Sequence, residues 1–244
     1  MVRNIRLNLF TVAVVLMCVG IVMIYSSSSI YAWERYKDGL FFLKRHLLFM
    51  LIGAVLTFVF MIIDYRKLKA IARPLVFISL LLLVLVLIPG IGREVSGARR
   101  WFRFKMISFQ PSELANLAVI IYVADFISRK ESLIKSLLKG FIPPIAVLGL
   151  CSLLIMLQPD LGTTVALGFV VLVMLFVGGV NYSYILSLIL CSLPALYLLV
   201  FNVPYRRQRI MAFINPWLDP RGSGFQIIQS QVALGSGGLF GVGL

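Results

Sequence analysis

The chain has 244 residues, of which 61% are hydrophobic and only 13% are charged. Charged residues make up about 25% of an ordinary soluble domain, so the composition excludes that class and indicates an integral membrane protein. The formal net charge of +14 would suit nucleic acid in a soluble chain. Here the basic residues lie between apolar runs, which favours the membrane surface or a phosphate-bearing lipid instead and predicts no nucleic-acid partner.

A helical span needs about 20 apolar residues, and the runs in this chain lack the two-residue alternation of a barrel strand. They predict an all-α, polytopic helical bundle that forms a single transmembrane domain over residues 1–244. The first run, which ends in four serines, is expected to be retained as a span. About seven spans are expected, at approximately 7–25, 47–63, 74–88, 111–127, 141–157, 163–177 and 184–201.

The connection between the third and fourth runs is rich in basic residues and contains Arg99, Arg100 and Trp101. Guanidinium groups match phosphate oxygens in a bidentate manner, so a lipid pyrophosphate is a natural ligand. The alternative is that the loop is anchored to anionic headgroups, with Trp101 in an interfacial aromatic belt. The residues alone leave both interpretations open.

The fourth run begins at Gln110-Pro111-Ser112-Glu113. Proline and an acidic residue in a first turn are typical of a helix start. Glu113 is a candidate site residue because an ionisable group in a span is a functional hypothesis, although a carboxylate also suits that position electrostatically. Near the other end of this run, the spacing of Asp125 and Arg129 predicts an ion pair between residues four apart.

Two further polar segments are candidates. Asp160 lies in the short connection between the fifth and sixth runs, at or slightly inside the membrane surface. After the seventh run, residues 202–244 are expected to begin a long extracytoplasmic loop, in which Arg206, Arg207 and Arg209 precede Asp219. The sequence stops at Leu244 in a glycine-rich segment, and we expect the chain to be truncated there.

Charge topology conflicts with a cytoplasmic N-terminus. That orientation places 10 of the 23 basic residues inside and 13 outside, against the positive-inside rule. Nine of those 13 lie in the two loops at 93–105 and 206–221. These loops can break the rule if they bind an anionic ligand.

No Walker A motif or metal-binding spacing is present, which argues against ATP-driven transport and against a zinc site. The three cysteines, Cys18, Cys151 and Cys191, all lie in apolar runs, and we expect no disulfide. We therefore predict no cofactor, although the sequence leaves a divalent cation undecided.

Five motifs together resemble the SEDS family, which contains FtsW, RodA and SpoVE. They are GARRW at 97–101, SFQPSELA at 108–115, QPDLGT at 158–163, YRRQRI at 205–210 and the segment that begins NPWLDP at 215. The strings YSSSS and NPWLDP are more similar to the FtsW and SpoVE branch than to RodA.

The resemblance implies a peptidoglycan glycosyltransferase that polymerises lipid II at the outer face of the bacterial cytoplasmic membrane, in cell division or sporulation, with a class B penicillin-binding protein. It also implies a ten-span fold, a cytoplasmic N-terminus and contact with membrane lipid. The predicted substrate-binding residues are Arg99, Arg100, Trp101, Gln110, Glu113, Asp160, Arg206, Arg207 and Arg209.

Two departures from the family pattern stand out. The presumed catalytic aspartate of the family falls beyond Leu244, so this chain is expected to be incomplete for catalysis. Asn116 stands where the family usually has lysine, and asparagine offers a hydrogen bond but no charge.

Two alternatives from other functional classes stay open. A lipid II flippase is one, although a transporter is expected to show internal repeats and none is convincing here. A non-catalytic scaffold of the division machinery is the other.

Overall fold

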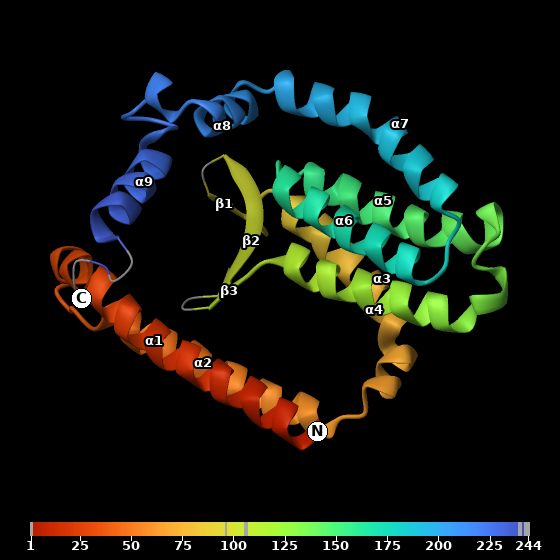
Figure 1. The fold of residues 1–244 in the computed structure, drawn as a ribbon, viewed down its shortest axis with the longest axis horizontal. Coiled ribbons are helices and arrows are strands. Elements are labelled where there is room, and N and C mark those ends of the chain that lie inside the picture. Colours follow the sequence, from red (N-terminus) through yellow and green to blue (C-terminus); the bar gives the residue numbers. More distant parts are fainter. Residues whose placement is uncertain (1, 96, 105–106, 239–240, 242–244) are drawn as a thin grey trace. The chain divides into compact units, whose positions relative to one another are not determined.

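The structure is a computed structural model that describes residues 2–95, 97–104, 107–238 and 241, drawn as a ribbon in Figure 1. The chain divides into two compact units. One comprises Met1–Ile63 with Val203–Leu244, and the other comprises Asp64–Asn202. Each unit is described by itself below.

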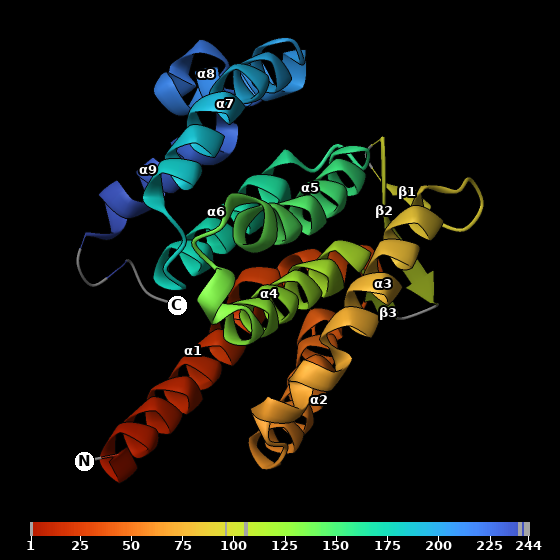
Figure 2. The same cartoon turned by 90° about the vertical axis from the view of Figure 1, so that its right-hand side faces the viewer.

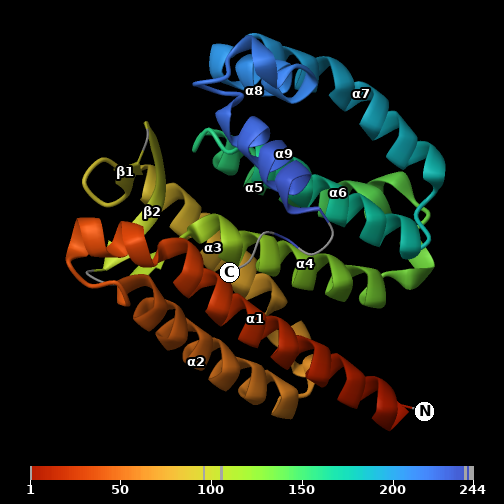
Figure 3. The same cartoon turned by 60° about the vertical axis from the view of Figure 1, so that its left-hand side comes forward.

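The first unit begins with a helical hairpin. Helices α1 (Val2–Tyr36) and α2 (Phe41–Ile62) lie side by side (Figure 3). In the turn, the Asp38 carboxylate accepts a hydrogen bond from the Leu40 amide at 3.0 Å and pairs with the Lys44 ammonium at 2.8 Å. The hydrogen bond from Lys44 and that from Leu40 lower the pKa of Asp38. The rings of Tyr36 and Phe41 stack at 4.0 Å and close the hairpin.

Helix α1 continues well beyond the end of the predicted span at Tyr25. It passes through the serine run, where the hydroxyls of Ser27 and Ser28 donate to the carbonyls of Met23 and Ile24, at 2.7 and 2.6 Å. A serine that bonds to the carbonyl four residues earlier no longer needs water as a partner. A run of serines at the end of an apolar stretch is therefore compatible with a continuous helix.

The second segment of the first unit, which the sequence predicts to begin a long extracytoplasmic loop, is mostly helical. It contains α8 (Pro204–Ile214), the short 3₁₀ helix η4 (Pro216–Leu218) and α9 (Phe225–Gly237). Prolines begin both α8 and η4, as expected where the first amide of a helix has no acceptor. Ala212 of α8 and Ile228 of α9 are buried, whereas the high content of arginine, glutamine and glycine in this segment predicts a polar loop.

The second unit is a helical bundle (Figure 2). Helix α3 packs extensively on α4, which also contacts α5 and α6. Fully buried side chains from all four helices, among them Leu83, Val119, Cys151 and Val171, form one hydrophobic core. In chain order the helices of this unit are η1 (Tyr65–Lys67), α3 (Leu68–Leu87), α4 (Pro111–Arg129), η2 (Glu131–Leu133), the π-helical turn η3 (Leu137–Phe141), α5 (Ile142–Met156), α6 (Leu161–Val177) and α7 (Tyr182–Phe201).

Within the described part of the chain, six helices are long and apolar enough to cross a membrane. They correspond to six of the seven predicted spans. The remaining predicted span forms α6, which is apolar but has only 17 residues. The predicted fold class, a polytopic helical membrane protein, is confirmed.

The basic connection before α4 folds into a small antiparallel sheet, which the sequence interpretation did not anticipate. Strands β1 (Arg93–Val95), β2 (Ala98–Phe104) and β3 (Ile107–Phe109) pair in the order β1-β2-β3. The sheet lies at the end of the bundle where α4 begins (Figure 1), and β2 contacts both α3 and α4. Ala98 and Phe102 are buried on β2, and Phe102 stacks on Phe109 of β3 at 6.5 Å. The apolar alternation is short and lies among arginines, so the sequence pattern alone predicts a loop here.

Candidate functional site

The Arg100 side chain ties the sheet to the connection between α5 and α6. Its Nε donates to the Gln158 carbonyl at 2.7 Å and its Nη2 donates to the Pro159 carbonyl at 2.6 Å. Its Nη1 lies 3.7 Å from Oδ2 of Asp160. The side chains of Arg100 and Asp160 are 30% and 14% exposed, so both charges are partly removed from water. We call these contacts the Arg100 latch.

The connection between α5 and α6, which Arg100 contacts, is also fixed by hydrogen bonds of its own. The Asp160 carboxylate caps α6 by accepting from the Thr163 amide at 3.2 Å, and its backbone carbonyl accepts from the Thr164 hydroxyl at 2.9 Å. The buried Gln158 side chain lies 3.4 Å from the Leu83 carbonyl of α3, to which it donates. Asp160 therefore stabilises a helix start while it balances the charge of Arg100.

Strand β2 has a bulge at Arg100. Arg93 of β1 pairs with Trp101 and Glu94 pairs with Arg99, so Arg100 has no partner residue in β1 and the regular alternation of side chains is interrupted there. Arg99 pairs across the sheet with Glu94, with Nη2 and Oε2 3.2 Å apart. Among the predicted substrate contacts, the structure brings Arg100 to Asp160 and pairs Arg99 with Glu94 instead.

The predicted residues at the start of α4 have different surroundings. Gln110 precedes α4 as its N-cap residue and is half-buried, while Glu113 is exposed in the first turn. Among the described side chains, three buried oxygens have no hydrogen-bond partner: Oγ of Ser112, Oδ1 of Asn116 and Oε1 of Gln158. Ser112 and Asn116 lie one helical turn apart, on the same face of α4.

The predicted ion pair near the end of α4 is confirmed. Arg129 Nε donates to Asp125 Oδ1 at 2.9 Å, and a second contact joins Nη2 to Oδ2. Asp125 is buried, so its charge is compensated by a neighbour four residues along the same helix. We interpret this ion pair as structural, because neither residue lines the pocket at residues 205–226 that is described below.

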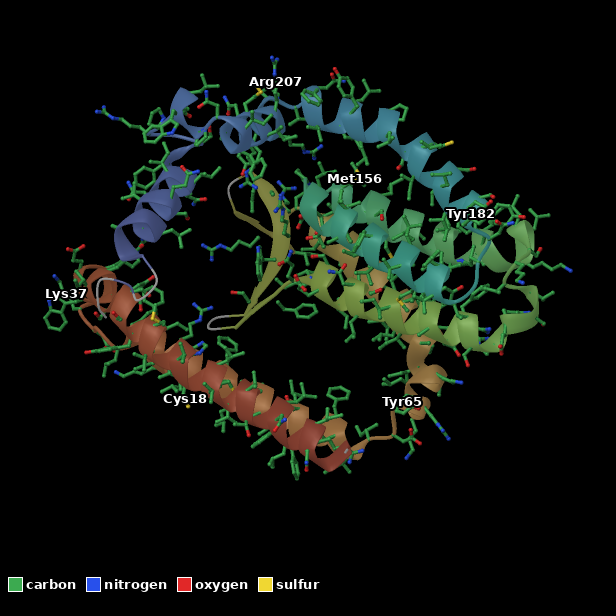
Figure 4. The ribbon with its side chains drawn as sticks, viewed as in Figure 1. Cys18, Lys37, Tyr65, Met156, Tyr182 and Arg207 are labelled. Carbon is green, nitrogen blue, oxygen red and sulfur yellow. The ribbon has the colours of Figure 1, made fainter. Side chains whose placement is uncertain are left out.

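The arginines of α8 are distributed around the helix. Arg206 is half-buried, and Arg207, labelled in Figure 4, is exposed. The Arg209 guanidinium lies over the ring of Tyr205, 4.6 Å from its centroid. Arg209 also lines a pocket of about 520 Å³ in residues 205–226, whose described lining is Tyr205, Gln208, Arg209, Asp219, Arg221, Gly222, Ser223, Phe225 and Gln226.

Among the lining residues of this pocket, the sequence predicted Arg209 as a substrate contact, placed Arg221 in a basic loop that can bind an anion and noted Asp219, but it did not indicate the others. The spacing of Tyr205 and Arg209, four residues apart, was the available signal for a stacked pair on one helix face. The Asp219-Pro220-Arg221-Gly222 string was the signal for a tight turn. The contributions of Gln208 and Gln226 depend on how α8 and α9 meet around that turn, which no local pattern reveals.

The described residues include no group of three or more histidine, cysteine, aspartate or glutamate side chains placed to hold a metal ion. The expectation about cofactors stays a prediction.

Comparison with known proteins identifies the family. Residues 6–244 match the FtsW/RodA/SpoVE family, described as "Cell cycle protein". The chain belongs to this family. It is 45% identical over 238 residues to a protein of Geobacter metallireducens named "Probable peptidoglycan glycosyltransferase FtsW", which covers 98% of this chain and 64% of that protein. It is 43% identical to "Stage V sporulation protein E" of Bacillus subtilis, with 98% of this chain and 65% of that protein covered.

Solved structures agree with the family fold. One, described as "Structural coordination of polymerization and crosslinking by a peptidoglycan synthase complex", matches with a TM-score of 0.64 and 34% identity, over 90% of this chain and 64% of that one. RodA of Thermus thermophilus matches with a TM-score of 0.51 and 31% identity, over 74% and 58% of the two chains. The chain thus spans 64% of the length of the first curated relative, and it is a multi-pass membrane protein of this family.

Proposed function

We propose that the protein to which this chain belongs is a peptidoglycan glycosyltransferase that polymerises lipid II. The observation that carries the proposal is the 45% identity over 98% of the chain to a relative named as such an enzyme. The proposed setting is the outer face of the bacterial cytoplasmic membrane during division or sporulation, with the N-terminus in the cytoplasm. A class B penicillin-binding protein is the proposed partner.

The chemistry requires a site that joins apolar and polar surroundings, because the substrate has a polyprenyl tail and a charged head. In the proposed transfer, an acceptor sugar hydroxyl forms a bond to the anomeric carbon of the donor. The bond from that carbon to the lipid pyrophosphate breaks, and the pyrophosphate leaves with the electron pair. The hydroxyl proton goes to a general base.

The contribution of this chain's residues is electrostatic. Guanidinium groups stabilise negative charge that builds up on a leaving pyrophosphate. The Arg100 guanidinium is engaged by Asp160 and two carbonyls, so we propose that it positions the α5–α6 connection. Arg209 supports direct binding better, because it lines an open pocket.

The test uses the protein encoded by its complete open reading frame, purified with its penicillin-binding partner in nanodiscs and supplied with lipid II. We expect glycan polymer on a gel, and we expect Trp101→Ala to abolish it. Trp33→Ala is the matched control, since Trp33 is an exposed tryptophan of α1, and it should retain polymer. Absence of polymer from the wild-type complex, or translocation of labelled lipid II without polymer, would overturn the proposal.

A further inference from the structure

The end of the second unit that lies opposite the sheet is strongly basic. Helix α3 runs away from this end toward β1, and α4 returns to it, so the segments 64–73 and 128–139 meet at the same end of the bundle (Figure 1). A hydrogen bond of 2.9 Å from the Lys69 ammonium to the Ser128 hydroxyl joins the two segments. Each segment contains four basic residues and one acidic residue. We call these two segments the basic end.

The carboxylates of this region do not balance its positive charge. Asp64 caps η1 by accepting a hydrogen bond from the Arg66 amide at 2.9 Å. Asp125, which precedes the second segment, is buried and pairs with Arg129, so it compensates one arginine of the four basic residues that follow it. Glu131 is the remaining acidic residue of the second segment. The basic end therefore keeps a net positive charge.

Three lysines of the second segment contribute to this excess charge. Lys130, Lys135 and Lys139 are exposed, and in the part of the chain that the structure describes, none of them forms an ion pair with a carboxylate. A lysine side chain can lay its apolar stem along the membrane edge while its ammonium reaches a phosphate. An anionic ligand at this end is therefore attracted by charges that the fold leaves uncompensated.

Exposed leucines lie among these lysines. Leu137 is 43% exposed and Leu138 is 72% exposed, and both belong to the π-helical turn η3, which leads into the apolar helix α5. Acyl chains of a bilayer remove such side chains from water, which is favourable. Basic side chains at the depth of the phosphates, with apolar side chains below them, are typical of segments that bind the surface of an anionic bilayer.

The core holds this turn from its inner side. Ile134 and Phe141 are buried in the hydrophobic core of the bundle. The Ser136 carbonyl accepts a hydrogen bond from the Gly140 amide at 2.9 Å, and a Cβ at Gly140 would collide with the Ile134 carbonyl oxygen. The turn is thus tightly folded before any ligand arrives, which reduces the entropy lost on binding.

From these features we infer that the basic end binds the phosphate of an anionic phospholipid. Lys130, Lys135 and Lys139 contact the headgroup, and Leu137 and Leu138 reach the acyl chains. A free phosphate would use the lysines and leave the leucines in water. An acidic peptide would also use the lysines, but the leucines adjoin a helix that is long and apolar enough to cross a membrane, where lipid is the neighbour. The ligand is a resident membrane lipid and not the substrate of the proposed glycosyltransferase.

The experiment measures how tightly the complete protein, purified in neutral detergent, binds phosphatidylglycerol that carries a fluorophore on one acyl chain. We expect Lys135→Gln and Lys139→Gln each to weaken binding about fivefold, the equivalent of about 1 kcal/mol, and the double variant to weaken it further. The charge-matched control is the double variant Lys37→Gln and Arg93→Gln, because both residues are exposed and lie outside the basic end. It should bind as the wild type does. Wild-type affinity in the variant that lacks Lys135 and Lys139 would overturn the inference.

Further comparisons distinguish a phospholipid from other occupants. Phosphatidylcholine with the same fluorophore should bind the wild type and the lysine double variant equally, because its headgroup has no net charge. Leu138→Ser should weaken binding of phosphatidylglycerol, and unchanged affinity would contradict the contact with acyl chains. A soluble polyglutamate peptide should displace the lipid poorly. Displacement by the peptide at lower concentrations than by unlabelled phosphatidylglycerol would overturn the lipid assignment in favour of an acidic protein partner.

Two measurements separate loss of charge from loss of fold. The thermal midpoints of all variants should match the wild type, since the replaced lysines are exposed, and the variant with Lys135→Arg and Lys139→Arg should bind phosphatidylglycerol as the wild type does. The wild type alone supplies a second test. Raising the salt concentration about tenfold screens the lysines and should weaken binding of phosphatidylglycerol but not of phosphatidylcholine. Binding that does not depend on salt would overturn the inference without any variant.

Discussion

Two arginine-rich regions of this chain differ in what their guanidinium groups already contact. Arg100 donates to the carbonyls of Gln158 and Pro159 and faces the Asp160 carboxylate. Arg209 and Arg221 instead line an open pocket, whose carboxylate, Asp219, accepts hydrogen bonds from its own turn. The same residue type therefore holds the fold together in one region and is available to a ligand in the other. The role of each arginine therefore depends on whether the fold places carbonyl or carboxylate acceptors beside it, and not on how basic the local sequence is.

Arg100→Ala should have the largest effect on stability. It leaves two carbonyls and the partly buried Asp160 without their donor, and an unsatisfied buried group typically costs about 1–3 kcal/mol. We expect a lower thermal midpoint for the protein in nanodiscs, followed by intrinsic fluorescence. Arg93→Ala is the control, because Arg93 is exposed on β1. If both variants melt together, Arg100 does not act as a latch.

Gly224→Ala should come second. The added Cβ would meet the Pro216 carbonyl, and forcing extra atoms into a packed site costs about 1–3 kcal/mol. We expect a lower thermal midpoint and weaker lipid II binding, because the pocket wall must shift. Gly235→Ala in α9 is the matched control, since a Cβ there has nothing within 4 Å. A Gly224→Ala protein with an unchanged midpoint would show that the turn adapts easily.

Arg221→Gln should hardly change stability while it weakens ligand binding. Surface substitutions usually alter the free energy of unfolding by no more than about 0.5 kcal/mol, and Arg221 is exposed. The thermal midpoint with and without lipid II tests this directly. We expect the ligand-free midpoints of variant and wild type to coincide and the ligand-induced rise to shrink. If Arg221→Gln lowered the ligand-free thermal midpoint as much as Arg100→Ala does, Arg221 would also have a structural role and the two regions would not differ.

The smallest expected effect is the pH response of Asp219. The pKa of this carboxyl lies below its ordinary value of 3.8. A depressed pKa means that the ionised turn stabilises the fold above pH 3.8 and loses that contribution as the pH falls through the lower, folded-state pKa. The charge of the pocket should therefore stay constant on mild acidification from neutral pH. Carboxyl NMR with Asp219→Asn as the assignment control checks this, and a midpoint above 3.8 would contradict it.

The sequence predicted the membrane class and most spans because long apolar runs report directly on helices that cross a bilayer. It also predicted the Asp125–Arg129 pair, which depends only on helical spacing. The predicted first span ended at the serine run because hydropathy treats serine hydroxyls as groups that need water. In the structure, the hydroxyls of Ser27 and Ser28 bond to backbone carbonyls within the helix.

Contacts between distant parts of the chain were beyond the sequence patterns. Arg100 meets carbonyls 58 and 59 residues away, so its engagement could not be read from its neighbours. The same holds for the bulge at Arg100, which depends on the pairing of β2 with β1. At the pocket, the arginines were visible in the sequence but their arrangement around the turn was not.

The length of α1 has a further consequence. Its 35 residues extend about 52 Å at 1.5 Å per residue, whereas the hydrocarbon layer is about 30 Å thick. Even at a steep tilt of about 40°, the helix covers about 40 Å along the bilayer normal. Its final turn, with Glu34 and Arg35, therefore stands beyond the hydrocarbon among headgroups and water. A thicker bilayer can be accommodated by uprighting this helix, so the hairpin of α1 and α2 can adapt to lipids of different chain length without moving a charge into the membrane.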